Sequence, residues 1–158
     1  MNNKWNWCAD FTVDKLFPLL KSAPIPKLPL SNGITTVVGD TYKTLINDVS
    51  NEAVILLYRA PCERCDATRN ALTVLSARFS KKSLNVFAMD LSQNDLPPID
   101  GLENVDSQPS IYFILNKVNL EPNTVLRKRM VKYLGDLLNE SEIRGFVIEN
   151  SSIIKDEL

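Results

Sequence analysis

The chain has 158 residues, of which 44% are hydrophobic, and its 18 basic and 19 acidic side chains leave a formal net charge of -1. This length and composition predict one globular domain with short appendages, and they exclude a disordered chain, a collagen and a coiled coil. The apolar runs are far shorter than the roughly 18 residues that a membrane-spanning helix needs, so we expect no membrane insertion. The balanced charge offers no basic surface for a phosphate backbone, which argues against a nucleic-acid partner.

Histidine is absent from the sequence. Its absence excludes histidine-based metal sites and the Ser-His and Cys-His pairs that activate nucleophiles. The cysteines are Cys8, Cys62 and Cys65, which are too few for a closed zinc site unless a carboxylate or a second chain completes it. We therefore expect no metal and no diffusible cofactor, and thiol redox chemistry is the better interpretation.

The first 33 residues contain two segments of different pattern. Residues 10–22 place apolar side chains at helical spacing, although Pro18 opposes a continuous helix. Residues 23–33 are rich in proline and turn formers, which is typical of an extended linker. We predict a remnant of a preceding domain over 1–22, a linker over 23–33, one domain over 34–150 and a tail over 151–158.

Strand-like and helix-like segments alternate within the predicted domain. The run 53–58 is continuously apolar, as expected of a buried central strand, and residues 62–79 form the longest amphipathic helix. The other predicted elements are strands over 34–38, 84–90 and 110–115, helices over 42–49 and 137–149, and a solvated edge strand over 124–133 that carries Arg127, Lys128 and Arg129. This order predicts an α/β fold, with a central mixed sheet flanked by helices.

The motif Cys62-Glu63-Arg64-Cys65 lies between the buried strand and the long helix, which is the context of a redox Cys-x-x-Cys. Cys62 is expected at the helix N-terminus, where unpaired backbone N–H groups and the helix dipole favour its thiolate, so we predict that it is the attacking nucleophile. Cys65, one turn further on, is expected to be buried and to resolve the mixed disulfide. A structural disulfide or half of a zinc site remains the alternative, although a bridge that encloses two residues adds little stability.

The two residues between the cysteines are predicted to tune the nucleophile. The cation of Arg64 favours the thiolate of Cys62, whereas the carboxylate of Glu63 opposes it. We expect Arg64→Ala to raise the pKa of Cys62 and Glu63→Ala to lower it.

The last four residues, Lys155-Asp156-Glu157-Leu158, form the receptor-read signal that returns proteins to the endoplasmic reticulum. The N-terminus carries no apolar segment or cleavage site of a secretory signal, so we expect the chain to be the C-terminal piece of a longer secretory protein. Disulfides persist in that oxidising lumen. Cys8 is then expected to be a buried or pairing thiol of the preceding domain. Asn139 and Asn150 each begin an N-glycosylation sequon.

Several segments together resemble the C-terminal catalytic domain of the protein disulfide isomerase family, over about residues 10–158. They are KLFPLLKSAPIP at 15–26, Val37-Val38-Gly39 with Thr41-Tyr42, Met89-Asp90 with Asn94-Asp95, Gln108-Pro109-Ser110-Ile111-Tyr112-Phe113, and Lys132-Tyr133 with Gly135. The resemblance implies a thioredoxin fold. It also implies that Pro109 is a cis-proline whose loop, with Gln108 before it, faces the two sulfurs and contacts the client.

The sequence also departs from the family pattern, which is usually Trp-Cys-Gly-His-Cys at the motif. Arg64 stands where the family has histidine, and Leu56 aligns with the buried glutamate that moves the proton of the resolving cysteine. The arginine that assists this step aligns near Leu137, and the candidates to replace it are Arg127, Arg129 and Arg144.

Two functions are compatible with these features. The first is a thiol-disulfide oxidoreductase or isomerase of the endoplasmic reticulum lumen that acts on unfolded secretory chains through Cys62 and Cys65, with the receptor of the Lys155–Leu158 signal as a second partner. The alternative is a redox-weak, thioredoxin-like chaperone or adaptor, which is favoured by the missing Leu56 carboxylate.

Overall fold

The computed structural model describes residues 19–47, 51–79, 84–97, 109–116, 120–121 and 129–155. Its centre is a six-stranded sheet with the order β1-β2-β4-β3-β5-β6. The strands are β1 (Leu30–Ser31), β2 (Ile34–Val37), β3 (Ala53–Tyr58), β4 (Asn85–Asp90), β5 (Ser110–Ile114) and β6 (Met130–Lys132). Strands β2, β4 and β3 are mutually parallel, whereas β5 is antiparallel to β3 and β6 to β5. Strands β3, β4 and β6 therefore end, and β5 begins, on the same side of the sheet. We call this side, which is formed by the ends of strands and not by an edge strand, the thiol edge.

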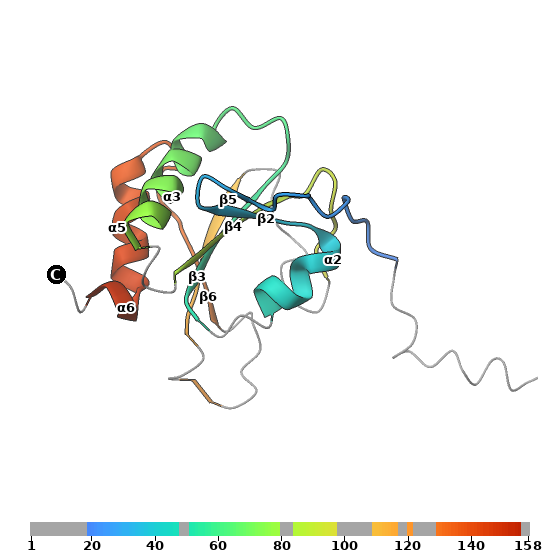
Figure 1. Ribbon diagram of the computed structural model, residues 1–158. Coiled ribbons are helices and arrows are strands. Elements are labelled where there is room, and N and C mark those ends of the chain that lie inside the picture. The colour runs from blue at the N-terminus through green and yellow to red at the C-terminus, as the bar shows by residue number, and fades with distance from the viewer. Residues whose placement is uncertain are drawn as a thin grey trace, which may run out of the picture.

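Helices cover both faces of this sheet (Figure 1). On one face lie α3 (Cys65–Phe79), α5 (Glu140–Asn150) and α6 (Ser152–Lys155), and on the other lie α2 (Gly39–Tyr42) and the π-helical turn η1 (Lys43–Asn47). This arrangement confirms the predicted α/β fold with a mixed central sheet. Across the residues that the structure describes, none of these helices is long and apolar enough to span a membrane.

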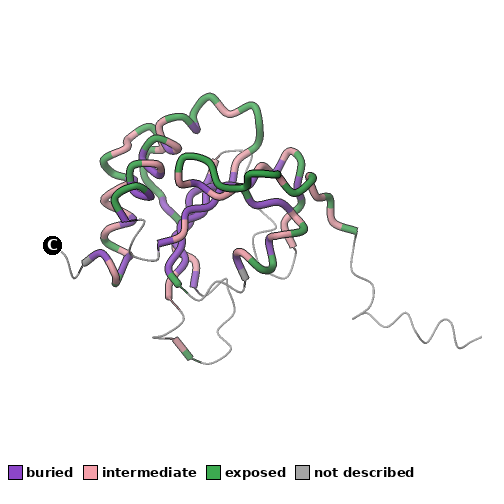
Figure 2. Tube along the Cα trace, in the orientation of Figure 1, coloured by how far each residue is buried: buried purple, intermediate pink, exposed green. Residues whose placement is uncertain are grey.

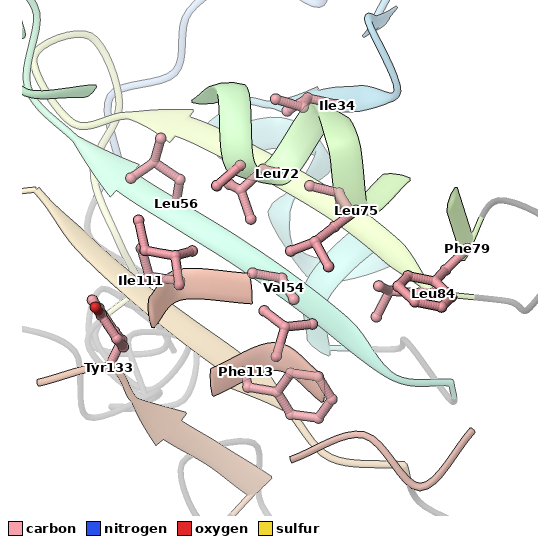
Figure 3. Close-up of a cluster of buried hydrophobic side chains, with 14 of the residues drawn as sticks. Ile34, Val54, Leu56, Leu72, Leu75, Phe79, Leu84, Ile111, Phe113 and Tyr133 are labelled. Atoms are coloured by element: carbon pink, nitrogen blue, oxygen red, sulfur yellow. The ribbon is translucent and has the colours of Figure 1, made fainter. Parts of the chain in front are cut away.

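The sequence of β3 explains why the sheet is buried on both sides. Successive side chains of a strand point to opposite faces, so Val54 and Leu56 face α3, while Ile55 and Leu57 face α2 and η1. All of these side chains are buried, and strands β3, β4 and β5 form the most deeply buried part of the described chain (Figure 2). Figure 3 shows the first of the two cores, where Leu72 and other residues of α3 pack against this face of the sheet.

The end of the predicted linker forms a hairpin. Strands β1 and β2 pair through Ser31 and Ile34, so that Asn32 and Gly33 make a two-residue turn. Both turn residues have positive φ, 50° and 76°, which is the conformation that an Asn-Gly hairpin turn requires. A Cβ at Gly33 would collide with the Ser76 side chain of α3, whose hydroxyl donates to the Gly33 carbonyl at 2.8 Å.

The helical pattern over residues 10–22 does not form a helix in the part of that segment that the structure describes. Residues 19–22 are not helical, because the backbone of Lys21 exchanges two hydrogen bonds with Asp95 instead, both 2.8 Å long. The remainder of the predicted helix lies outside the described residues. Next to this contact, Oδ1 of the buried Asn94 accepts from the backbone N–H groups of Ala23 and Gly39, at 2.8 and 2.9 Å. Part of the predicted linker is thus held against the domain, and the division of the chain into parts stays a prediction.

The C-terminal end of the described chain is held by a buried carboxylate. Glu52, 1% exposed and next to the first residue of β3, accepts hydrogen bonds from the Ser151 hydroxyl and from the backbone N–H and hydroxyl of Ser152, the last two at 2.7 and 2.6 Å. Ile154 of α6 is buried in the core shared with α3 and α5. Residues 151–154 therefore pack onto the domain, at the edge of the sheet opposite the thiol edge.

Two helices differ from their predicted bounds. The helix predicted over 137–149 starts at Glu140, because Asn139 caps it by accepting from the Glu142 backbone N–H at 3.2 Å. The helix predicted over 42–49 is divided between α2, which begins at Gly39, and the wider turn η1.

Candidate functional site

Cys62 and Cys65 lie at the thiol edge, between the end of β3 and the start of α3, and form a disulfide. Their Cα atoms are 5.4 Å apart, within the separation that a disulfide tolerates. Cys65 is 1% exposed, whereas Cys62 is half-buried. The pair is therefore asymmetric in the sense that the sequence predicts, with one sulfur-bearing residue open to a partner and the other enclosed.

The helix begins at Cys65 and not at Cys62, which corrects the prediction of a helix over 62–79. Residues 62–65 form a turn that is closed by a hydrogen bond from the Cys65 N–H to the Cys62 carbonyl, 3.3 Å long. The disulfide nevertheless keeps the Cys62 sulfur beside the first residue of the helix. The positive end of the helix dipole and its unpaired N–H groups therefore still act on this sulfur.

The loop before Cys62 is fastened to the end of β4. The Asp90 carboxylate accepts from the backbone N–H groups of Ala60 at 3.1 Å and Ser92 at 2.8 Å. Arg59 donates to the Leu91 carbonyl at 2.8 Å, and the Ala60-Pro61 peptide bond is cis. These contacts fix where the chain leaves the sheet and hence where Cys62 stands.

The electrostatics of this loop favour the ionised form of Asp90. Burial alone would raise the pKa of its carboxyl, but the hydrogen bonds from Ser92 and Ala60 and the charge of Arg69 outweigh burial, so the pKa lies below its ordinary 3.8. The Arg69 guanidinium lies over the Tyr58 ring, 4.5 Å from its centroid. Both residues line a cavity of about 480 Å³ that also reaches Asp66, the neighbour of Cys65.

The first turn of α3 is also tied to the loop that follows β6. The buried Thr68 hydroxyl donates to the Leu137 carbonyl at 3.1 Å. In the same loop, Leu134 is 87% exposed and Leu138 is 52% exposed. A Cβ at Gly135 would lie 2.4 Å from the Tyr133 hydroxyl, so the loop needs glycine there. Two exposed leucines thus stand at the thiol edge, beside the turn that carries Cys65.

The remaining predicted site residues are only partly placed by the structure. Glu63 and Arg64 are exposed in the turn between the two cysteines. Pro109 directly precedes β5, whose first residue pairs with Leu57, so Pro109 lies at the thiol edge. Gln108, the Gln108-Pro109 peptide bond and Cys8 lie outside the described residues, and the predicted cis form of that bond stays a prediction.

The structure supplies no carboxylate at the position of Leu56. This side chain is completely buried among apolar neighbours and pairs in register with Ala88 and Ile111 on the adjacent strands. The departure from the family pattern therefore affects the interior of the domain and is not compensated on those two strands.

Arg129, one of the candidate replacements for the family arginine, lies at the wrong end of the sheet. It precedes β6 and donates twice to the Leu115 carbonyl, at 2.7 and 3.0 Å, at the edge opposite the thiol edge. It is completely buried, which corrects the prediction of a solvated edge at this residue, while Lys128 lies outside the described residues; burial lowers the pKa of the Arg129 guanidinium. Arg144 forms an ion pair with Glu140 on α5, with 3.7 Å between a guanidinium nitrogen and a carboxylate oxygen. Arg127 lies outside the described residues.

Sequence reasoning missed the residues that support the site, namely Asp90, Arg69, Thr68 and Leu134. Asp90 was noted only as part of a family resemblance, and its position at the end of a predicted parallel strand was the one available signal. The partners of the other three residues lie far from them in the sequence or form part of a loop, so periodicity gives no indication of their contacts.

Comparison with known proteins gives a consistent fold and a partial sequence match, although no family model matches the chain. The chain is 30% identical over 104 residues to "Protein disulfide-isomerase A4" of Homo sapiens, which is 65% of this chain and 16% of that protein. It is 32% identical over 143 residues to "Protein disulfide isomerase-like 1-4" of Arabidopsis thaliana, which is 89% of this chain and 23% of that protein. The chain thus spans less than a quarter of the length of either relative.

Solved structures share the fold at lower identity. Full-length ERdj5 superposes with a TM-score of 0.57 at 15% identity, over 75% of this chain and 16% of that one. Chloroplastic thioredoxin z superposes with a TM-score of 0.55 at 15% identity, over 73% of this chain and 92% of that one. The predicted thioredoxin fold is confirmed, and the chain is homologous to part of the protein disulfide isomerases that it matches.

Proposed function

We propose that this chain is a thiol-disulfide oxidoreductase whose redox group is the Cys62–Cys65 pair, acting on the cysteines of folding secretory proteins. The observation that carries the proposal is the asymmetry of the pair, with Cys62 half-buried and Cys65 1% exposed at the start of α3. The partial sequence match to protein disulfide isomerases supports the same chemistry.

In the reducing direction, the Cys62 thiolate attacks one sulfur of a client disulfide. A bond forms between Cys62 and that sulfur, the client disulfide breaks, and the other client sulfur leaves as a thiolate. Cys65 then loses its proton and attacks the Cys62 sulfur, which expels the second client thiolate. The protein pair is oxidised to the disulfide that the structure contains, and the client disulfide is reduced to two thiols.

In the oxidising direction, the same steps run backwards. A client thiolate attacks the half-buried Cys62, and Cys65 leaves as a thiolate that must take up a proton inside the domain. A second client thiolate then displaces Cys62, so the client is oxidised and the protein pair is reduced. Since Leu56 offers no carboxyl to carry this proton, transfer to and from Cys65 is slow and the mixed disulfide is long-lived.

The proposed location is the lumen of the endoplasmic reticulum, which rests on the Lys155–Leu158 signal. The proposed partners are unfolded secretory chains and the receptor of that signal. The exposed Leu134 and Leu138 at the thiol edge offer apolar contacts for an unfolded client.

The second candidate is a thioredoxin-like chaperone or adaptor that holds clients without efficient turnover. The completely buried, uncharged Leu56 favours it, because the proton of the resolving cysteine has no internal acceptor at that position. The exposed leucines would serve this function equally.

Insulin reduction by wild type, Cys62→Ser and Cys8→Ser separates the two candidates. The oxidoreductase loses activity in Cys62→Ser and keeps it in Cys8→Ser, the matched control that removes a cysteine outside the pair. If wild type reduces insulin no faster than Cys62→Ser, the chain is a binding module. Expression of Cys65→Ser in the lumen, followed by identification of proteins bound covalently to Cys62, then identifies the clients.

A further inference from the structure

We propose that Asn139 is an N-glycosylation site of this domain and that the second sequon, at Asn150, stays unmodified because the fold holds its side chains in hydrogen bonds. This inference rests on the proposed lumenal location but not on redox activity. The sequons are Asn139-Glu140-Ser141 and Asn150-Ser151-Ser152. Transfer requires an accessible asparagine Nδ2 and an accessible hydroxyl two residues later.

At the first sequon, Asn139 is half-buried and Ser141 is exposed, and among the described residues neither the Asn139 Nδ2 nor the Ser141 hydroxyl donates a hydrogen bond. Asn139 lies just before α5 with an extended backbone, φ -95° and ψ 91°. Its Oδ1 caps the helix by accepting from the Glu142 N–H, while its Nδ2 donates to no other group among the described residues. Ser141 is exposed, and its hydroxyl oxygen receives only a long contact of 3.4 Å from Arg144.

The cap of α5 survives the modification. In the transfer, a bond forms between Asn139 Nδ2 and the anomeric carbon of an oligosaccharide, and the bond from that carbon to a lipid diphosphate breaks. Nδ2 loses one proton, and the lipid diphosphate leaves with the bonding electron pair. The donor is the lipid-linked oligosaccharide of the lumen. Oδ1 takes no part, so it continues to accept from Glu142.

At the second sequon, the same groups are occupied by the fold. Asn150 is the last residue of α5, and its Nδ2 donates to the Phe146 carbonyl at 2.8 Å. The Ser152 hydroxyl donates to the buried Glu52 at 2.6 Å, and Ser151 between them is completely buried and donates to the same carboxylate. Although Ser152 is exposed, its hydroxyl and its backbone N–H are both held by Glu52, so the sequon cannot present these groups to a transferase until those hydrogen bonds break.

The position of Asn139 gives the glycan a defined place. Strand β6 runs toward the thiol edge, and Leu137, two residues before Asn139, accepts a hydrogen bond from Thr68 on the first turn of α3. Leu138, directly before Asn139, is half-exposed. A glycan on Asn139 therefore stands at the rim of the thiol edge, next to an apolar side chain that faces solvent.

The test uses the full chain behind a cleavable secretory leader, with an added N-terminal Asn-x-Thr tag that reports entry into the lumen. Mobility on gels, before and after treatment with an endoglycosidase, counts the glycans. We expect two glycans on wild type and on Asn150→Gln, one on Asn139→Gln and Ser141→Ala, and two again on Ser141→Thr, which restores the sequon. Mass spectrometry after enzymatic release then places the second glycan on Asn139.

A second variant tests whether the fold protects Asn150. In an Asn139→Gln background, Glu52→Ala frees Ser152, so a second glycan returns at Asn150. A tagged wild type that carries only the tag glycan would overturn the proposal, as would loss of the second glycan in Asn150→Gln. An unchanged single glycan in the Glu52→Ala double variant would overturn the explanation by the hydrogen bonds to Glu52. The tag glycan keeps these results separate from failure to enter the lumen, and insulin reduction tests the redox proposal independently.

Discussion

Replacing Leu56 by glutamate should restore an internal proton acceptor and shorten the life of the mixed disulfide. Leu56 faces the α3 side of the sheet, completely buried, in the same core as Leu72 (Figure 3). A carboxyl group placed there is enclosed with the first turns of the helix that carries Cys65. Positioned acid-base groups accelerate proton transfer by about 10²–10⁴-fold, and we expect an effect near the lower limit because the site did not evolve around this group.

The same substitution should destabilise the domain, and the structure indicates by how much. Burial of a leucine side chain contributes about 1.5–3 kcal/mol, which is lost when a polar group replaces it. A loss of about 2–3 kcal/mol lowers the melting temperature of a chain of this size by about 4–12 °C. The variant should therefore still be folded at 25 °C, where the kinetics are measured.

The assay mixes the reduced protein with a disulfide-linked fluorescent peptide in a stopped-flow instrument, and acid-quenched samples report the mixed disulfide. Leu56→Gln is the matched control, because it has the same size and polarity as the glutamate variant but no ionisable carboxyl. We expect Leu56→Glu to release the peptide about 10²-fold faster than Leu56→Gln. If the two folded variants release it at the same rate, the missing carboxylate does not limit turnover.

Three further predictions follow from contacts at the two edges of the sheet. Glu52→Ala removes three hydrogen bonds to a buried carboxylate and should lower the free energy of unfolding by about 3 kcal/mol or more, as measured by urea denaturation. A loss below about 0.5 kcal/mol would contradict the role of Glu52 as the residue that holds α6 on the domain. The folded pKa of Asp90 lies below 3.8, so its ionised form adds stability above about pH 4, and this stability disappears as the pH falls through the folded pKa. Asp90→Asn should therefore have a lower free energy of unfolding than wild type at pH 6, and the difference should shrink toward pH 3. A difference that stays constant with pH would refute this assignment. In the reduced protein, Cys62 should alkylate at least about tenfold faster than the buried Cys65, as measured by mass spectrometry of labelled peptides, and equal rates would remove the basis of the proposed mechanism.

The sequence alone predicted the elements whose side chains repeat at a regular period. The apolar run at Ala53–Tyr58 indicated the central strand with its observed bounds, because a strand that is buried on both faces leaves no polar position. The helix that follows was predicted correctly as a helix, but its predicted start lies three residues before the observed one. The residues just before its observed start are Cys62, Glu63 and Arg64, whose local pattern does not distinguish a helical turn from the turn that precedes a helix.

The contacts missed by sequence reasoning are those between polar residues far apart in the chain. Glu52 and its partner Ser151 are separated by 99 residues, and nothing in either local pattern identifies the other. The sequence around Arg129 predicted a solvated edge strand. In the structure, the Leu115 carbonyl accepts two hydrogen bonds from the buried Arg129 guanidinium. Such pairings arise from topology, and periodicity gives no information about them.

The buried amide of Asn94 has a practical consequence for dissecting this protein. Its oxygen is shared by the N–H groups of Ala23 and Gly39, and its nitrogen donates to the Asp90 carbonyl at 2.9 Å. A recombinant fragment that starts at residue 34, where the strand pattern first indicates a boundary, would lose one of these donors together with the segment that packs against Asn94, and would expose this amide to water. The minimal folding unit accordingly reaches back at least to Lys21, and shorter versions should show a looser loop after β4 and, through Asp90, a less ordered approach to the cysteines.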